Sequence, residues 1–204
     1  MQNNGKSVII GLTGKAGSGK SFISEQITEK TGFRLVKLDY QAGQVANKFL
    51  LKQALQRKIK RKIPKAHEDI QLFPLLKDLD TPFRNWETSL FLMFLNRKLK
   101  KIIREARKNG ESLIVDFISL PFLKCIELFD RVYLVETDND KRLERLGARD
   151  GMTKEWAEQQ EKFIEKFYSK HDTFDFCGVI YNDYEELPKE VEELIEEFKE
   201  NGRY

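Results

Sequence analysis

The sequence predicts an α/β protein with a five-stranded parallel sheet and helices on both faces. Five short apolar runs alternate with longer segments that have helical spacing, which is the pattern of parallel strands buried on both sides. A glycine-rich loop joins the first run to the first helical segment. No repeat or linker divides the 204 residues, so we expect a single domain, 1–204. The predicted strands are Ser7–Thr13, Arg34–Asp39, Ser112–Phe117, Arg131–Glu136 and Gly178–Asn182.

The glycine-rich loop matches G-x-x-x-x-G-K-[ST], and its strand–loop–helix context is the one that this phosphate-binding motif requires. The motif therefore predicts a three-layer P-loop NTPase fold that binds ATP with Mg²⁺. We expect Lys20 to reach the β- and γ-phosphates and the Ser21 hydroxyl to ligate Mg²⁺. The candidate ATP-binding residues are Gly14, Ala16, Gly17, Ser18, Gly19, Lys20, Ser21 and Phe22.

The stretch 41–110 has no convincing strand and is expected to be a helical insertion after the second strand, the position where kinases of this fold place the acceptor. Its last helix is predicted to start near Thr81-Pro82, because a capping residue precedes a proline at the first helical position. Asn109-Gly110 is a stop signal for that helix.

Composition indicates a soluble globular protein: 40% of the residues are hydrophobic, 34% are charged, and the formal net charge is +3. The stretch Lys52–Lys65 is strongly basic. The first interpretation of this stretch is a solvated helix face, and the second is a site for a phosphate-rich small ligand. A nucleic-acid site comes third, because the stretch has no interleaved aromatic residues that could stack on bases.

Two cysteines, Cys125 and Cys177, are too few for a metal site or a disulfide framework, and both are expected to be small core residues. No signal peptide or membrane-spanning stretch is visible, so a cytoplasmic location is expected. The sequence does not indicate an oligomeric state.

Two carboxylates end predicted strands beside the phosphate loop. Asp39 could orient an acceptor hydroxyl and accept its proton, and the alternative is a cap for the following helix. Asp116 closes the apolar strand Leu113–Asp116 and could contact Mg²⁺ through water, with a structural cap as the alternative.

The segment 138–172 is expected to act as a lid. Arg145 and Arg149 lie four residues apart, so a helix would place both on one face, where two guanidiniums could clamp a transferring phosphoryl group. The alternative is an ion-pair stripe with Glu144 and Asp150.

Together these residues resemble the dephospho-coenzyme A kinase family. The segment Ile10–Ser21 is similar to the family's opening Ile-Gly-Leu-Thr-Gly and its Gly-Ser-Gly-Lys-Ser/Thr motif. Leu143–Met152 resembles the lid sequence Arg-Leu-X-X-Arg-Asp-Gly-Leu, and Val179–Asn182 resembles Val-Ile-Asp-Asn. Leu187–Leu194 looks like the family's terminal helix. The similarity covers about 8–46 and 113–194.

The resemblance implies ATP-dependent phosphorylation of the ribose 3′-hydroxyl of dephospho-coenzyme A, the last step of coenzyme A biosynthesis. It implies Asp39 as the catalytic base and Asn182 near the adenine, and Arg57, Lys58 and Arg61 could meet the acceptor's diphosphate. The alternatives are a kinase for another nucleoside or nucleotide, or a non-enzymatic protein that binds ATP or nucleic acid.

The chain also departs from the family pattern. Lys37 stands where the family has the first acid of Asp-X-Asp, and Phe22 replaces a small residue after the P-loop serine. The family's acceptor-region elements are not recognisable between Phe49 and Lys108.

Overall fold

The computed structural model describes residues 7–39, 41, 85–150, 174–183 and 186–201. They contain a parallel five-stranded sheet with the strand order β2-β3-β1-β4-β5. All five predicted strands are confirmed, and their ends differ from the expected ones by no more than two residues. The strands are β1 (Ile9–Thr13), β2 (Arg34–Lys37), β3 (Leu113–Asp116), β4 (Arg131–Glu136) and β5 (Gly178–Tyr181).

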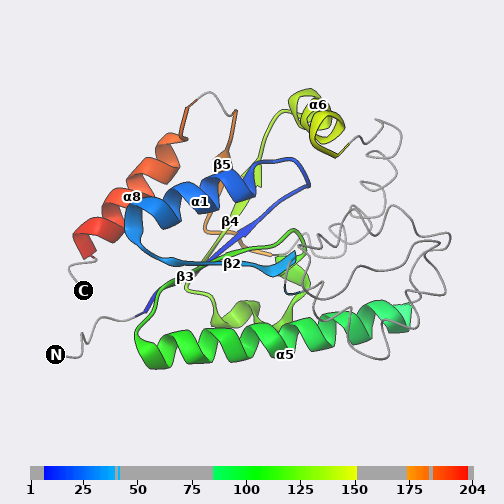
Figure 1. The fold of residues 1–204 in the computed structure, drawn as a ribbon, viewed down its shortest axis with the longest axis vertical. Coiled ribbons are helices and arrows are strands. Elements are labelled where there is room, and N and C mark those ends of the chain that lie inside the picture. Colours follow the sequence, from blue (N-terminus) through cyan, green and yellow to red (C-terminus); the bar gives the residue numbers. More distant parts are fainter. Residues whose placement is uncertain (1–6, 40, 42–84, 151–173, 184–185, 202–204) are drawn as a thin grey trace.

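Helices cover both faces of the sheet, as predicted. In Figure 1, α1 and α8 lie on one side of the strands and α5 lies on the other, while α6 lies at the end of the molecule where the β1–α1 loop turns. The helices are α1 (Lys20–Thr31), α5 (Asn85–Asn109), α6 (Asn139–Asp150) and α8 (Lys189–Asn201), with short 3₁₀ turns at Leu120–Phe122 and Lys124–Leu128. None of these described helices is long and apolar enough to cross a membrane.

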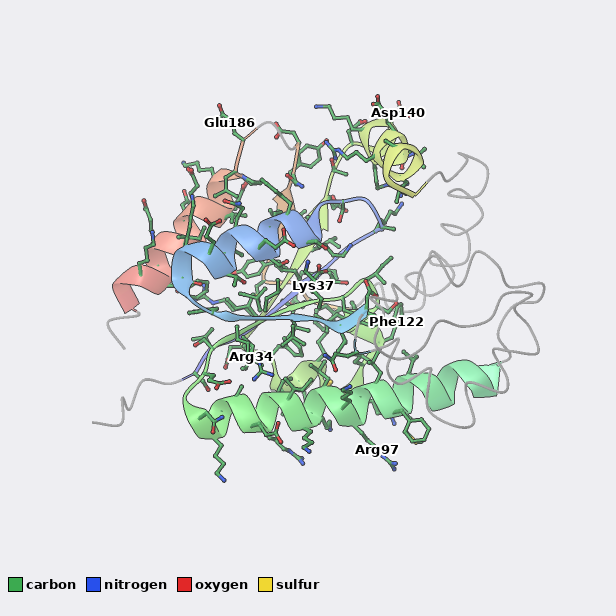
Figure 2. The ribbon with its side chains drawn as sticks, viewed as in Figure 1. Arg34, Lys37, Arg97, Phe122, Asp140 and Glu186 are labelled. Carbon is green, nitrogen blue, oxygen red and sulfur yellow. The ribbon has the colours of Figure 1, made fainter. Side chains whose placement is uncertain are left out.

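The alternation of side chains along the strands divides the core into two layers. Ile9 of β1 packs with Leu95 and Leu99 of α5, whereas Ile10 packs with Ile23 of α1 and Val191 of α8. From Arg97 on, the exposed residues of α5 are polar. Figure 2 shows Arg97 extending from the helix away from the sheet. Burial on both sides therefore holds the strands rigid beneath the loops at their carboxyl ends.

Several expectations fall on residues outside the described part. Only residues 41 and 85–110 of the expected acceptor insertion are described, and only 138–150 of the expected lid. Arg57, Lys58 and Arg61 also lie outside. Of the two cysteines, Cys125 is buried as expected, and burial raises the pKa of its thiol to about 11. Cys177 is exposed, so its expected place in the core is wrong: it immediately precedes the edge strand β5, which has a neighbour on one side only.

An ion pair fastens α8 to the sheet. Arg131, the first residue of β4, donates two hydrogen bonds to the carboxylate of Glu197, one of them 2.7 Å long, and its guanidinium lies 5.7 Å from the centre of the Phe198 ring. The hydrogen bonds lower the pKa of Glu197 and raise that of Arg131. The two-pronged geometry favours a measurable contribution to stability.

We expect Glu197→Gln to lower the free energy of unfolding by about 1 kcal/mol at neutral pH, the upper end for a partly exposed pair. Because the pKa of Glu197 is depressed in the folded state, the difference from the wild type should be full above the ordinary value of 4.5. The difference should shrink as the pH falls through the depressed pKa. Below it, Glu197 of the wild type is protonated in both the folded and the unfolded state. Urea unfolding across this range measures it.

The matched control is Glu193→Gln, which removes the exposed pair between Glu193 and Lys189 of the same helix. That change should cost no more than a few tenths of a kcal/mol. Equal losses for the two variants at neutral pH would contradict a specific role for Glu197.

Candidate active site

The loop between β1 and α1 has the backbone of an anion-binding turn. Gly14, Gly17 and Gly19 all adopt positive φ angles, of 141°, 79° and 91°. At Gly14 an added Cβ would lie 2.2 Å from the carbonyl oxygen of Val135, so the loop can pass β4 only with glycine at this position. The motif therefore has the conformation that the sequence predicted for it.

Helix α1 starts at Lys20, and the N–H groups of its first turn have no side-chain cap. Its N-cap residue is Gly19, which has no side chain to occupy the first N–H groups, and the first turn contains no acidic residue. Those N–H groups and the partial positive charge of the helix terminus favour a bound anion. Phe22 of this turn is 37% exposed.

Lys20 lies folded against the loop that precedes it. Its ammonium donates a hydrogen bond to the carbonyl oxygen of Lys15 at 2.9 Å, and only 8% of the residue is exposed. A positive charge held over the loop lies where the motif predicts it, beside the expected position of the nucleotide phosphates.

Ser21 and Asp116 meet at the carboxyl edge of the sheet. The Ser21 hydroxyl donates a hydrogen bond of 2.7 Å to Oδ2 of Asp116, and Asp116 is 6% exposed. The contact arises because β3 pairs directly with β1, with Asp116 in register with Leu12. A hydroxyl and a carboxylate are oxygen ligands of the kind that Mg²⁺ prefers, so the residues present fit that ion. In the described part of the chain, no group of three or more histidine, cysteine or acidic side chains is arranged to hold a metal ion.

Asp39 lies just past the end of β2, at the same edge. β2 ends at Lys37, which is in register with Asp116, and Asp39 follows two residues later with a half-buried side chain. Lys37 forms an ion pair with Glu25 of α1 at 2.6 Å. Lys37, which stands where the family has the first acid of Asp-X-Asp, is thus paired with α1. Asp39 is the carboxylate that follows β2 at this edge of the sheet.

Two arginines of α6 face different parts of the site. Arg142 is 3% exposed and donates to the carbonyl oxygen of Ala16 at 3.1 Å and to Oδ1 of Asn139 at 2.6 Å. Burial lowers the pKa of Arg142, because desolvation disfavours the charged guanidinium. Arg145 instead donates to Thr137 Oγ1 at 3.4 Å and to the carbonyl oxygen of Asp183 at 3.1 Å, so it links the loops after β4 and β5.

Arg142 therefore contacts the phosphate loop, and it was not among the residues predicted for the site. The helical spacing gave a signal, because Arg142 lies three residues before Arg145 and hence on a neighbouring position of the same helix surface. The side chain of Arg149, which α6 also contains, lies outside the described part. The phosphoryl clamp expected of Arg145 and Arg149 stays a prediction.

Asn182, directly after β5, is fully buried and also contacts the phosphate loop. Its side-chain amide donates to the carbonyl oxygen of Ser18 at 3.0 Å, and its backbone N–H donates to Glu136 at 2.8 Å. The sequence reasoning expected this residue near the adenine. The structure shows a contact with the loop itself, and the position near the adenine stays a prediction.

Comparisons with known proteins give a family for this arrangement. A family model described as dephospho-CoA kinase matches residues 8–165. The dephospho-CoA kinase of Streptococcus agalactiae serotype III (strain NEM316) is 33% identical over 159 residues, which are 74% of this chain and 78% of that protein. The dephospho-CoA kinase of Fusobacterium nucleatum is 28% identical over 195 residues, 93% of this chain and 97% of its own.

A solved structure agrees on the fold. That of dephospho-CoA kinase from Campylobacter jejuni superposes with a TM-score of 0.53, covering 95% of this chain and 98% of its own at 19% identity. The family match spans the phosphate loop, β3 with Asp116 and all of α6, which are the elements that build the site. The chain belongs to the dephospho-CoA kinase family.

Proposed function

We propose that this chain transfers the γ-phosphoryl group of ATP to the ribose 3′-hydroxyl of dephospho-coenzyme A, the last step of coenzyme A biosynthesis. The observation that carries the chemistry is the contact between Ser21 and Asp116 beside the Lys20 ammonium, at the edge where Asp39 also lies. These groups are the parts that phosphoryl transfer needs: a phosphate cradle, a cation and a carboxylate. The choice of acceptor rests on membership of the family.

In the proposed mechanism the nucleotide phosphates bind the N–H groups of the loop and of the first turn of α1. The Lys20 ammonium shifts from the Lys15 carbonyl to the β- and γ-phosphates, where it offsets the charge that develops during transfer. Ser21, and Asp116 through water, would hold Mg²⁺, which when bound neutralises phosphate charge. Phe22 and Asn182 belong to the nucleotide side of the site.

Asp39 serves as the base. Its carboxylate accepts the proton of the acceptor hydroxyl while that oxygen bonds to the γ-phosphorus, and the bond from the γ-phosphorus to the bridging oxygen breaks to release ADP. Arg145 and Arg149 are assigned to the phosphoryl clamp of the lid, which would close over the nucleotide. A cytoplasmic location is proposed with this role.

The basic residues Arg57, Lys58 and Arg61 are proposed to bind the diphosphate of the acceptor. Replacing all three by glutamine should raise KM for dephospho-coenzyme A by about tenfold or more, since charge-assisted contacts to phosphate are lost. KM for ATP should change by less than about twofold, because the ATP phosphates lie on a separate loop. Steady-state kinetics with each substrate varied in turn measures both.

The matched control removes three positive charges from the exposed outer surface of α5, with Arg97, Lys101 and Arg104 each changed to glutamine. It should leave both KM values near the wild type. A similar rise in the acceptor KM for both triple variants would attribute the effect to overall charge and contradict a local site.

The experiment that tests the proposed function is an acceptor panel. ADP release from ATP and Mg²⁺ is measured with dephospho-coenzyme A, nucleosides and nucleotides, each over a range of concentrations. We expect dephospho-coenzyme A to give the highest kcat/KM. Turnover with a nucleoside or nucleotide and none with dephospho-coenzyme A would contradict the proposed acceptor but leave phosphoryl transfer in place.

A further inference from the structure

Two buried side chains from outside the phosphate loop hold its backbone. Arg142 of α6 donates to the carbonyl oxygen of Ala16, and Asn182 after β5 donates to that of Ser18, at 3.1 and 3.0 Å. The two donors are 3% and 0% exposed. Elements more than a hundred residues away in the sequence thus hydrogen-bond two peptide groups of the loop, Ala16–Gly17 and Ser18–Gly19.

These two bonds set the direction of loop N–H groups. In a planar trans peptide the carbonyl and the following N–H point in opposite directions. A carbonyl of Ala16 held by Arg142 therefore turns the N–H of Gly17 away from that arginine, and the bond from Asn182 does the same for Gly19. Because both are glycines at positive φ, their peptides would otherwise rotate with little steric cost.

The stem of Arg142 is also packed against the loop. A Cβ added at Gly17 would lie 3.0 Å from Cγ of Arg142 and 3.0 Å from Cγ of Leu146, so α6 contacts the loop with no room for a side chain between them. Asn139, at the start of α6, accepts from the second nitrogen of the guanidinium at 2.6 Å and fixes its orientation. Positive charge here also adds to the field that attracts a polyphosphate.

We infer that Arg142 and Asn182 are positioning residues that hold the phosphate loop in the shape that binds ATP, with Arg142 acting from the outer side of the loop through Ala16. Preorganisation of this kind raises affinity because the loop does not have to be ordered when the nucleotide binds. The inference rests on the nucleotide-binding half of the proposed function and does not depend on which acceptor is used.

The test compares Arg142→Met with Arg142→Lys. The methionine keeps most of the stem but removes the charge and the hydrogen bonds to Ala16 and Asn139, whereas the lysine keeps a cationic donor. Arg104→Met, at an exposed position of α5, is the matched control for losing an arginine. The readouts are Kd for ADP by calorimetry without acceptor, the KM values for ATP and dephospho-coenzyme A, and Tm.

We expect Arg142→Met to weaken ADP binding and raise KM for ATP by about tenfold, the size typical of losing hydrogen bonds to a charged group. KM for dephospho-coenzyme A should stay within about twofold, Arg142→Lys should recover part of the ADP affinity, and Arg104→Met should match the wild type. If Arg142→Met only lowers Tm and the folded protein binds ADP normally, Arg142 is a structural residue and the inference is wrong.

Asn139→Ala keeps the result decisive if Arg142→Met does not fold. Asn139 is exposed, and its loss removes one hydrogen-bond partner of the guanidinium while leaving Arg142 in place. We expect weaker ADP binding in the same direction but of smaller size. Unchanged ADP affinity in this variant would overturn the positioning role. Because ADP binding needs no acceptor, failure of this inference is distinguishable from a wrong acceptor assignment.

Discussion

Replacing Lys20 by alanine is expected to lower kcat by about 10²–10³ while the fold is retained. Lys20 provides the positive charge that follows the phosphates into the transition state, and loss of one such contact typically has this effect. Its ammonium donates a hydrogen bond to the Lys15 carbonyl within the loop, so the charge already lies beside the expected phosphate position. Single-turnover and steady-state rates of ADP formation measure the loss.

The control for this change is Lys30→Ala, in the last turn of the same helix, where the side chain is exposed. That variant should turn over like the wild type. Near-normal kcat for Lys20→Ala, in protein whose circular dichroism and Tm match the wild type, would remove Lys20 from the mechanism.

Asp39→Asn is expected to lower kcat by about 10²–10⁴, the usual contribution of a positioned general base. The amide keeps the shape of the side chain but cannot accept the acceptor's proton, so ATP affinity should change little. Kinetics at saturating ATP and dephospho-coenzyme A, with ADP affinity from calorimetry, separate the two effects.

Asp175→Asn is the matched control, since Asp175 is exposed and precedes the amino end of β5, at the opposite edge of the sheet. It should have wild-type kinetics. If Asp39→Asn instead loses ATP affinity and turns over normally at saturation, Asp39 serves the nucleotide or the fold and another group is the base.

Features that depend on local sequence could be predicted. The glycine pattern of the phosphate loop determines its own backbone, so Gly14, Gly17 and Gly19 have the positive φ angles that the motif requires. Two carboxylates that end buried parallel strands must reach the same edge of the sheet. For Asp116 this produced the contact with Ser21, because β3 pairs directly with β1.

Features that depend on packing between distant segments could not be predicted. The sequence places Arg142, Arg145 and Arg149 on one helix but does not give the rotation of that helix about its axis. The contact of Arg142 with the loop was therefore not predicted. The contacts of Arg142 and Asn182 with the loop span 126 and 164 residues. Likewise, nothing in the residues around Cys177 indicates that the neighbouring strand β5 lies at an open edge.

The proposed reaction is phosphoryl transfer from ATP to the 3′-hydroxyl of dephospho-coenzyme A at this loop. The most direct measurement is phosphorus NMR of the product formed from ATP, Mg²⁺ and dephospho-coenzyme A by the wild-type chain and by Lys20→Ala. We predict that the wild type forms a single new phosphate monoester on the ribose 3′-oxygen and that Lys20→Ala forms almost none in the same time. Absence of that monoester, or equal amounts from both proteins, would contradict it.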